Sequence, residues 1–269
     1  MLILFILLVL LVALFVLALA GRSGHKNLDE LSRWSYAHRG LHSDGIPENS
    51  LAAFKLAAWK GYGSELDVHL MKDGGLAVIH DSLLKRTTGR DGRIEDLTVK
   101  ALPYCHLEGT FQTIPTLQEV LEVYEGKAPL IIELKTEDGN HAELCQAACQ
   151  ALEGYQGLYC IESFDPRCIQ WLKENKPHII RGQLAANFIK DKSVKLSFPL
   201  RVVLTNLLMN FLTAPDFIAY KFEDRKSIAR RVCEKVWNIQ QVSWTLRNPK
   251  QYDAAVEEGA IPIFEGFEP

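Results

Sequence analysis

Four apolar segments of the sequence carry, at or near their ends, side chains that could perform acid–base or metal chemistry. They are His38 and Arg39 after WSYA, Glu65 and Asp67 in SELDVHL, His80 and Asp81 at the end of LAVIHD, and Glu133 and Lys135 in LIIELK. In a strand, alternation places Glu65 and Asp67 on one face, and it does the same for Glu133 and Lys135. If the four segments are neighbouring strands, these side chains converge on one site.

The residue types in this set indicate a particular chemistry. Three carboxylates supply hard oxygen ligands, which suit Ca²⁺ or Mg²⁺ better than zinc. Two imidazoles can divide the duties of general base and general acid near neutral pH. Arg39 and Lys135 could hold an anionic, tetrahedral group of oxygens. Together these properties describe cleavage of a phosphodiester. His69 lies one step further along the face of Glu65 and Asp67 and is predicted to be structural.

Strand-like and helix-like segments alternate from Trp34 to the C-terminus. NSLAAFKLAAWKG reads as a helix capped by Asn49 and stopped at Gly61, and PTLQEVLEVYEG as a helix that begins with a Thr116–Glu119 capping box. Such alternation is typical of parallel strands with crossover helices, and about eight units favour an α/β fold, a (β/α)8 TIM-type barrel. Active sites of these barrels lie at the C-terminal ends of the strands, where the residues above are found.

Composition narrows the class of protein. The chain has 269 residues, 48% of them hydrophobic, and a formal net charge of -3. An acidic balance without Lys/Arg tracts argues against a nucleic-acid partner and favours a small-molecule substrate. The six cysteines form no CxxC pair and no zinc-like spacing with histidine, so they are predicted to be reduced and structural.

The first twenty residues, MLILFILLVLLVALFVLALA, contain no charged or polar side chain. As a helix they would reach about 30 Å, the thickness of a hydrocarbon core, which predicts an N-terminal transmembrane helix. A secretory signal peptide is the alternative, but the run lacks a basic n-region and exceeds the usual ~7–15 apolar residues. The expected organisation is an anchor at 1–21, a juxtamembrane linker at 22–33 and a globular domain at 34–269. Basic residues after the span place that domain on the cytoplasmic side.

Further motifs accompany these residues in order along the chain. They are HRG at 38–40, PENS at 47–50, ELDV at 65–68, KDGGLAVIHD at 72–81, RTTG at 86–89, IPTLQEVL at 114–121, IIELK at 131–135 and VSWTL at 242–246. With this set the sequence resembles the glycerophosphodiester phosphodiesterase family over nearly everything beyond the anchor. Their joint occurrence makes the resemblance more specific than any single motif.

The resemblance implies a TIM-type barrel with a small insertion, from about Ser82 to Ile114, between the third strand and its helix. It also implies metal-dependent hydrolysis of glycerophosphodiesters to sn-glycerol 3-phosphate and an alcohol, in which the neighbouring glycerol hydroxyl is the internal nucleophile. The implied site residues are His38 and His80 as the acid–base pair, Glu65, Asp67 and Glu133 as ligands of one divalent cation, Ca²⁺ or Mg²⁺, and Arg39, Lys135 and Trp244 as substrate contacts.

Two segments depart from the family pattern. The apolar stretch at 198–212 reads either as a barrel helix buried against the sheet or as an interfacial helix that rests on a bilayer. At the C-terminus, IPIFEGFEP replaces the Asp-Pro-like turn of the family, and Glu268–Pro269 are predicted to have no catalytic role.

Two other functions fit the sequence. The nearer alternative is a lysophospholipase D-like phosphodiesterase that acts on membrane lipids with the same residues. The more distant alternative is a membrane-tethered binding protein on a catalytically dead barrel. Its signature would be the loss of a histidine or a metal carboxylate, and none is lost.

Overall fold

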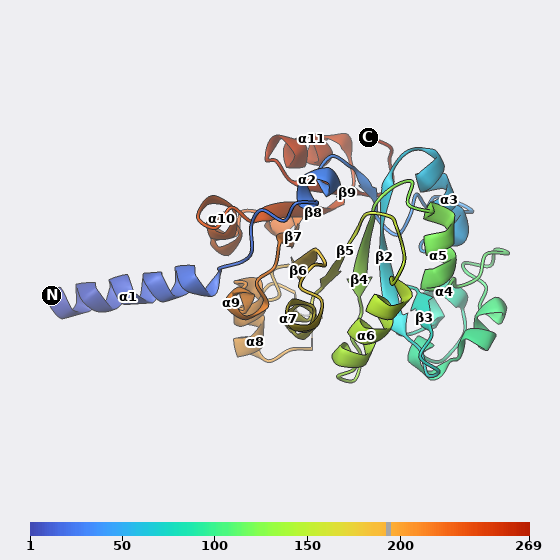
Figure 1. Cartoon of the computed structure of the whole chain (residues 1–269), viewed down its shortest axis with the longest axis horizontal. Helices are drawn as coiled ribbons and strands as arrows, with labels where there is room; N and C mark the ends of the chain where they lie inside the picture. The colour runs from blue at the N-terminus through green and yellow to red at the C-terminus, as the bar shows by residue number, and fades with distance from the viewer. Residues whose placement is uncertain (192–194) are drawn as a thin grey trace.

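A closed barrel forms the centre of the computed structural model, which describes residues 1–191 and 195–269 (Figure 1). In the described residues the strand order is β1-β9-β8-β7-β6-β5-β4-β2-β3, and β1 also pairs with β2 to close the barrel. All pairings except that of β3 are parallel, which confirms the predicted TIM-type barrel. The strands are β1 (Tyr36–Ala37), β2 (Gly63–Leu70), β3 (Leu76–Val78), β4 (Leu130–Leu134), β5 (Tyr159–Ser163), β6 (Arg181–Ala185), β7 (Phe217–Lys221), β8 (Gln240–Leu246) and β9 (Ile261–Phe264).

Helices cover the outside of the barrel, and several begin at a side-chain cap. Thr116 and Glu119 form the predicted capping box of α5, but the cap of the preceding helix α3 is Ser50, not Asn49. The helices are α1 (Leu2–Ala18), α2 (Leu28–Leu31), α3 (Leu51–Trp59), α4 (Lys85–Thr88), α5 (Leu117–Tyr124), α6 (His141–Ala151), α7 (Pro166–Asn175), α8 (Phe198–Thr205), α9 (Asn210–Thr213), α10 (Ile228–Lys235) and α11 (Pro249–Glu257).

The interior of the barrel changes from apolar to polar along its strands. Ile131 on β4 and Cys160 on β5 belong to an apolar cluster that fills the barrel. Two residues further on, the same faces of these strands carry Glu133 and Glu162, which are also buried. The C-terminal mouth is therefore the polar end, as TIM barrels require of an active site. All six cysteines are buried and free, in agreement with the predicted structural role.

The segment LAVIHD does not form a barrel strand, which corrects the prediction of a third parallel strand. Its strand, β3, pairs antiparallel with β2. The insertion therefore begins with β3 itself. It lies in the sequence between β2 and β4, which pair with each other in the barrel, and it has an apolar cluster of its own. Because the hairpin folds back along β2, the N–H of Ile79 donates to the carbonyl of Asp67 at 3.0 Å. This return brings His80 to the level of the barrel mouth.

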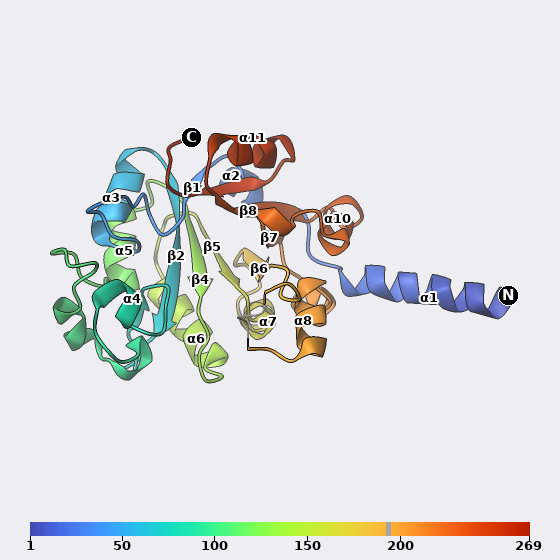
Figure 2. The same cartoon turned by 180° about the vertical axis from the view of Figure 1, so that it is seen from behind.

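The N-terminal helix α1 projects from the domain beside α10 (Figures 1 and 2). It has 17 residues, and at 1.5 Å per residue it reaches only about 26 Å. Its last turn is held by the domain, since the indole N–H of Trp237 donates to the carbonyl of Val16 at 2.8 Å and Leu19 is buried. In the described residues no helix is both long and apolar enough to cross a membrane, which corrects the prediction of a transmembrane helix.

Arg22 fixes the segment after α1 to the barrel. Its guanidinium donates to both carboxylate oxygens of Asp216, which is fully buried, and to the carbonyl of Pro177 at 2.6 Å. Arg22→Ala is expected to lower the free energy of unfolding by about 3 kcal/mol, because the buried carboxylate loses its charge partner. Urea unfolding of the full-length chain measures this loss, with the exposed Arg33→Ala as control. Equal losses for the two variants would contradict the prediction.

The apolar stretch at 198–212 is not one helix. It is divided between α8 and the start of α9, with Leu207 in a left-handed conformation at φ 56 between them. Thr205 and Asn210, expected on the polar and exposed side of an interfacial helix, are buried, and the hydroxyl of Tyr220 donates to the carbonyl of Thr205 at 2.9 Å. This arrangement ties the stretch to the barrel and does not support the predicted interfacial helix.

Candidate active site

The turn after β1 holds His38 and Arg39 in a fixed geometry at the mouth of the barrel. The N–H of His38 donates to the carbonyl of Phe264 at 2.9 Å, and the N–H of Arg39 donates to the Glu65 carboxylate at 3.1 Å. Arg39 and Gly40 have φ values of 56 and 77. A Cβ on Gly40 would lie 2.8 Å from Ala53 Cβ, so the close approach of α3 requires glycine here.

The three predicted metal ligands do lie together. Glu65 and Asp67 point inward from β2, and Glu133 stands opposite Asp67 in the register of β4. Each offers a carboxylate oxygen within 4.8 Å of the others, and all three are buried. Three carboxylates in this space repel one another unless a positive charge lies among them. They therefore fit one hard divalent cation, Ca²⁺ or Mg²⁺.

Burial and the charges around this cluster shift the pKa values of its three carboxyl groups. Burial, and then the charge of Asp67, raises the pKa of Glu65 well above its usual range. Burial also raises the pKa of Glu133 to about 7. Burial alone would raise the pKa of Asp67, but Lys135, His80 and Arg39 together hold it well below its usual range. The Lys135 ammonium lies 2.9 Å from Asp67 and 2.7 Å from Glu133, so this predicted phosphate contact sits beside the cation site.

The PENS segment braces the site. The amide of Asn49 donates to Asp67 at 2.8 Å instead of capping α3. Glu48 accepts from the Arg39 guanidinium at 3.0 Å and from Arg86 of the RTTG motif at 2.6 Å. The loop after β1 and the insertion are thus linked through Glu48. Asn49 therefore orients the Asp67 carboxylate, and Glu48 orients the Arg39 guanidinium.

The insertion supplies His80. Its Nδ1 lies 2.6 Å from Asp81 Oδ1, so Nε2 is the ring nitrogen that can exchange a proton with a ligand. Burial, and then the charge of Lys135, lowers the pKa of His80 to about 4. His69 has the structural role predicted for it, since its ring nitrogens lie 2.7 Å from Glu95 and 3.1 Å from the carbonyl of His80.

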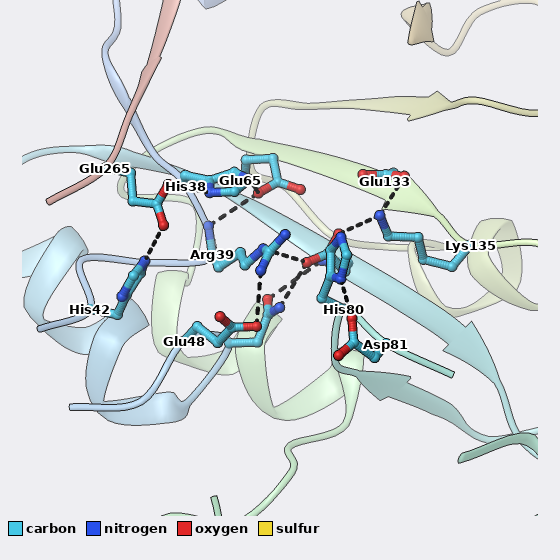
Figure 3. A network of polar contacts seen from close by, with 12 residues as sticks. His38, Arg39, His42, Glu48, Glu65, His80, Asp81, Glu133, Lys135 and Glu265 are labelled. Carbon is cyan, nitrogen blue, oxygen red and sulfur yellow. Dashed lines mark hydrogen bonds and ion pairs between the residues drawn. The ribbon is translucent and has the colours of Figure 1, made fainter. Parts of the chain in front are cut away.

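Glu265, just after β9, is a site residue that the sequence analysis missed. Its carboxylate lies 3.5 Å from His38 Nδ1 and 3.5 Å from His42 Nε2 (Figure 3). It also lies 2.8 Å from the Arg247 guanidinium. Burial lowers the pKa of His38, and the contact with Glu265 opposes that shift. Glu265 therefore positions the His38 ring from its Nδ1 side. The sequence did contain one signal for it: Glu265 lies two residues after Ile263, which faces the barrel interior, so alternation places Glu265 on the same face.

Glu265→Gln is expected to lower kcat tenfold to a hundredfold with KM changed less than threefold. The ring of His38 loses a carboxylate partner that orients it and raises its basicity, while the groups that bind substrate stay in place. Steady-state kinetics on the full-length chain measure both constants. Glu268→Gln, at an exposed acid near the same end of the chain, is the control. A rise in KM with unchanged kcat would instead indicate substrate binding by Glu265.

The mouth of the barrel contains one cavity of about 160 Å³, which most of the predicted site residues border. Trp244, the predicted aromatic contact, lines it with its indole N–H donating to the carbonyl of Ala219 at 3.1 Å and its ring packed edge-on to Phe164 at 5.6 Å. The cavity is lined by His38, Arg39, Glu65, His80, Glu133, Lys135, Glu162, Phe164, Leu184, Lys221, Trp244, Thr245, Arg247 and Ile263. With the exception of buried Asp67, every predicted site residue thus borders one space, and Asp67 is tied to it through Lys135.

The fold and the site define a class of protein: a TIM-barrel protein whose C-terminal mouth combines two imidazoles with a buried carboxylate cluster suited to a divalent cation. The model of the glycerophosphoryl diester phosphodiesterase family matches residues 38–265, so the chain belongs to that family. The match spans the barrel from the HRG turn to Glu265.

Individual relatives agree with this assignment. A glycerophosphodiester phosphodiesterase of Caldanaerobacter subterraneus subsp. tengcongensis is 36% identical over 158 residues, which are 55% of this chain and 65% of that protein. One of Bacillus altitudinis is 33% identical over 60% of this chain and 70% of its own length. The chain thus spans about two thirds of these relatives. A solved Oleispira antarctica phosphodiesterase, in complex with the product sn-glycerol-3-phosphate, is 25% identical with a TM-score of 0.69, over 86% of this chain and 92% of that one.

Proposed function

We propose that this chain hydrolyses glycerophosphodiesters to sn-glycerol 3-phosphate and an alcohol, with two histidines and one divalent cation. One observation carries the proposal: two imidazoles border the same small cavity as Glu65 and Glu133, which form a buried carboxylate cluster with Asp67. Membership of the family supports the reaction class, and the relatives named above supply the substrate class.

The histidines would divide the proton transfers. The pKa values of both imidazoles are lowered, that of His80 to about 4, so both are predominantly neutral at pH 7 and able to accept a proton. One removes the proton of the glycerol 2-hydroxyl as its oxygen bonds to phosphorus. The other, protonated beside the bound phosphate anion, gives its proton to the departing alcohol oxygen. Water then opens the cyclic phosphate to the monoester.

The remaining groups would bind and orient the phosphate. The guanidinium of Arg39 and the ammonium of Lys135 lie at the cavity and carry positive charge that a phosphate monoanion can use. A cation held by Glu65, Asp67 and Glu133 would neutralise charge that develops on the phosphate oxygens. Trp244 and Phe164 offer apolar surface to the carbon atoms of the substrate.

Product analysis with the full-length chain tests the proposal. Glycerophosphocholine, glycerophosphoethanolamine and lysophosphatidylcholine are compared in Ca²⁺, Mg²⁺ and chelator. Glycerol 3-phosphate from the two deacylated diesters, lost in chelator, supports the proposal. Turnover of lysophosphatidylcholine alone would point to the lysophospholipase D-like alternative, and no turnover by a folded chain would point to a binding protein. The cytoplasmic location of the domain also stays a prediction, which a topology reporter at the C-terminus would test.

A further inference from the structure

Glu162 on β5 is a buried acid at the cavity with no role in the chemistry described above. Its exposed fraction is 1%, and it lines the cavity wall between β4 and β6. Its Oε2 has no hydrogen-bond partner, and no residue within 1–191 or 195–269 forms an ion pair with it. Leaving a buried carboxylate oxygen unpaired is costly, so a ligand that satisfies it is the natural explanation.

Glu162 is not placed to join the cation site. It stands opposite Glu133 in the β4–β5 register, but Glu65 and Asp67 are two strands away on β2. At a strand spacing of ~4.8 Å, β2 and β5 are roughly 10 Å apart. The carboxylate group whose oxygens lie within 4.8 Å of one another consists of Glu65, Asp67 and Glu133 and does not include Glu162.

The chemistry of this wall points to a hydroxyl. Burial, and then the charge of Glu133, raises the pKa of Glu162 well above its usual range. Protonated or ionised, the carboxyl group keeps an acceptor oxygen for an O–H or N–H donor, and it offers no positive charge to a phosphate. The neighbouring cavity surface is apolar and aromatic, with Phe164, Leu184 and Trp244. A short carbon chain with a hydroxyl group matches that combination of one acceptor and flat apolar surface.

We propose that Glu162 accepts a hydrogen bond from the primary hydroxyl, at C1, of the substrate's glycerol unit, and that it selects substrates in which this hydroxyl is free. The inference rests on the proposed function, in which the 2-hydroxyl is used for attack on phosphorus. A 1-acyl group removes the donor. The cavity, with about 160 Å³, holds roughly ten waters, so an acyl chain would have to extend out through its mouth. Deacylated diesters are therefore preferred over 1-acyl lysophospholipids.

The decisive comparison uses a substrate that lacks only this hydroxyl. Propane-1,2-diol phosphocholine keeps the 2-hydroxyl nucleophile of glycerophosphocholine but has a methyl group at C1. A substrate that leaves the buried Glu162 carboxyl group without its hydrogen bond predicts a tenfold to hundredfold preference of the wild-type chain for glycerophosphocholine in kcat/KM. In Glu162→Leu this preference is expected to fall below threefold. Leucine fills a similar volume and removes a buried carboxyl group that has an unpaired oxygen, so the fold is expected to tolerate it.

Glu162→Gln, which keeps one acceptor oxygen, is expected to retain part of the preference, and Glu174→Gln on the exposed face of α7 is the control. Calorimetric titration with Ca²⁺ is expected to give the same affinity in all variants. An unchanged preference in Glu162→Leu would overturn the proposal, and so would a loss of Ca²⁺ affinity, because Glu162 would then be a metal ligand.

Equilibrium binding separates this inference from the proposed function. Calorimetry compares sn-glycerol 3-phosphate with propane-1,2-diol phosphate on the wild-type chain and on Glu162→Leu. If no diester is hydrolysed but the wild-type chain binds the glycerol compound at least tenfold more tightly and the variant does not, the proposed function fails and the glycerol subsite stands. Equal binding of both compounds by the wild-type chain would overturn the subsite.

Discussion

Replacing either catalytic candidate, His38 or His80, with alanine is expected to lower kcat by about 10²- to 10⁴-fold. Each imidazole borders the cavity and is held from its Nδ1 side by a carboxylate, Glu265 for His38 and Asp81 for His80. Alanine removes the proton-transferring nitrogen and keeps all three carboxylates of the cluster, of which Glu65 lies 3.8 Å from His38 Nε2. KM is expected to change little, since the phosphate is bound by other groups.

Steady-state kinetics on glycerophosphocholine, with calorimetric Ca²⁺ binding in parallel, test this expectation. His141→Ala is the matched control, because that imidazole lies at the start of α6, its Nδ1 is 3.0 Å from the carbonyl of Gly139, and it does not line the cavity. The double variant of His38 and His80 is expected to be little worse than the weaker single variant, because the two act in one reaction. Retention of more than a tenth of kcat by His80→Ala would exclude it as the acid or the base.

The second large effect is expected at the carboxylate cluster. Glu65→Gln keeps an acceptor for the Arg39 N–H but removes one anionic ligand. We expect affinity for Ca²⁺ or Mg²⁺ to fall at least a hundredfold, about 2.7 kcal/mol, and activity at low cation concentration to be lost with it. Chelation of the wild-type chain is expected to abolish activity, and added cation to restore it.

The same substitution is expected to stabilise the fold in chelator. The pKa of Glu65 is raised by burial and by Asp67, so above the ordinary pKa of a glutamate the ionised group opposes folding. Glutamine removes that penalty at neutral pH. Thermal unfolding in chelator and in Ca²⁺ measures both effects, with the exposed Glu122→Gln as control. A Glu65→Gln chain that is less stable in chelator, yet binds Ca²⁺ normally, would show that Glu65 is structural.

Much of the site could be predicted from local sequence. Alternation within SELDVHL and LIIELK fixes which side chains share a face, because successive residues of a strand point to opposite sides. Parallel strands joined by helices place their C-terminal ends at one mouth, so Glu65, Asp67 and Glu133 could be brought together without a structure. Local capping chemistry predicted the start of α5 correctly for the same reason: it depends on residues three apart.

Other features depended on contacts between distant segments, which no local pattern specifies. LAVIHD is strand-like by itself, but its antiparallel pairing with β2 is decided by the insertion that packs behind it. Asn49 could cap a helix, but the buried carboxylate of Asp67 takes its amide and leaves the cap to Ser50. The apolar N-terminus predicted a spanning helix, but α1 has 17 residues, its last turn accepts a hydrogen bond from Trp237, and Arg22 after it binds the buried Asp216.

Two acids at the barrel mouth show most clearly which features the sequence predicts and which depend on the tertiary structure. Glu162 and Glu265 come from β5 and from the end of β9, and their sequence surroundings resemble those of ordinary strand ends. The sequence by itself determined the family, the barrel and the candidate residues for acid–base and cation chemistry, because these are encoded in motifs and in strand periodicity. Only the closed barrel decided that Glu265 meets His38 and that Glu162 faces the substrate cavity. Closure brings together strands that lie more than a hundred residues apart. Contacts between their side chains therefore depend on the tertiary packing and not on the local sequence.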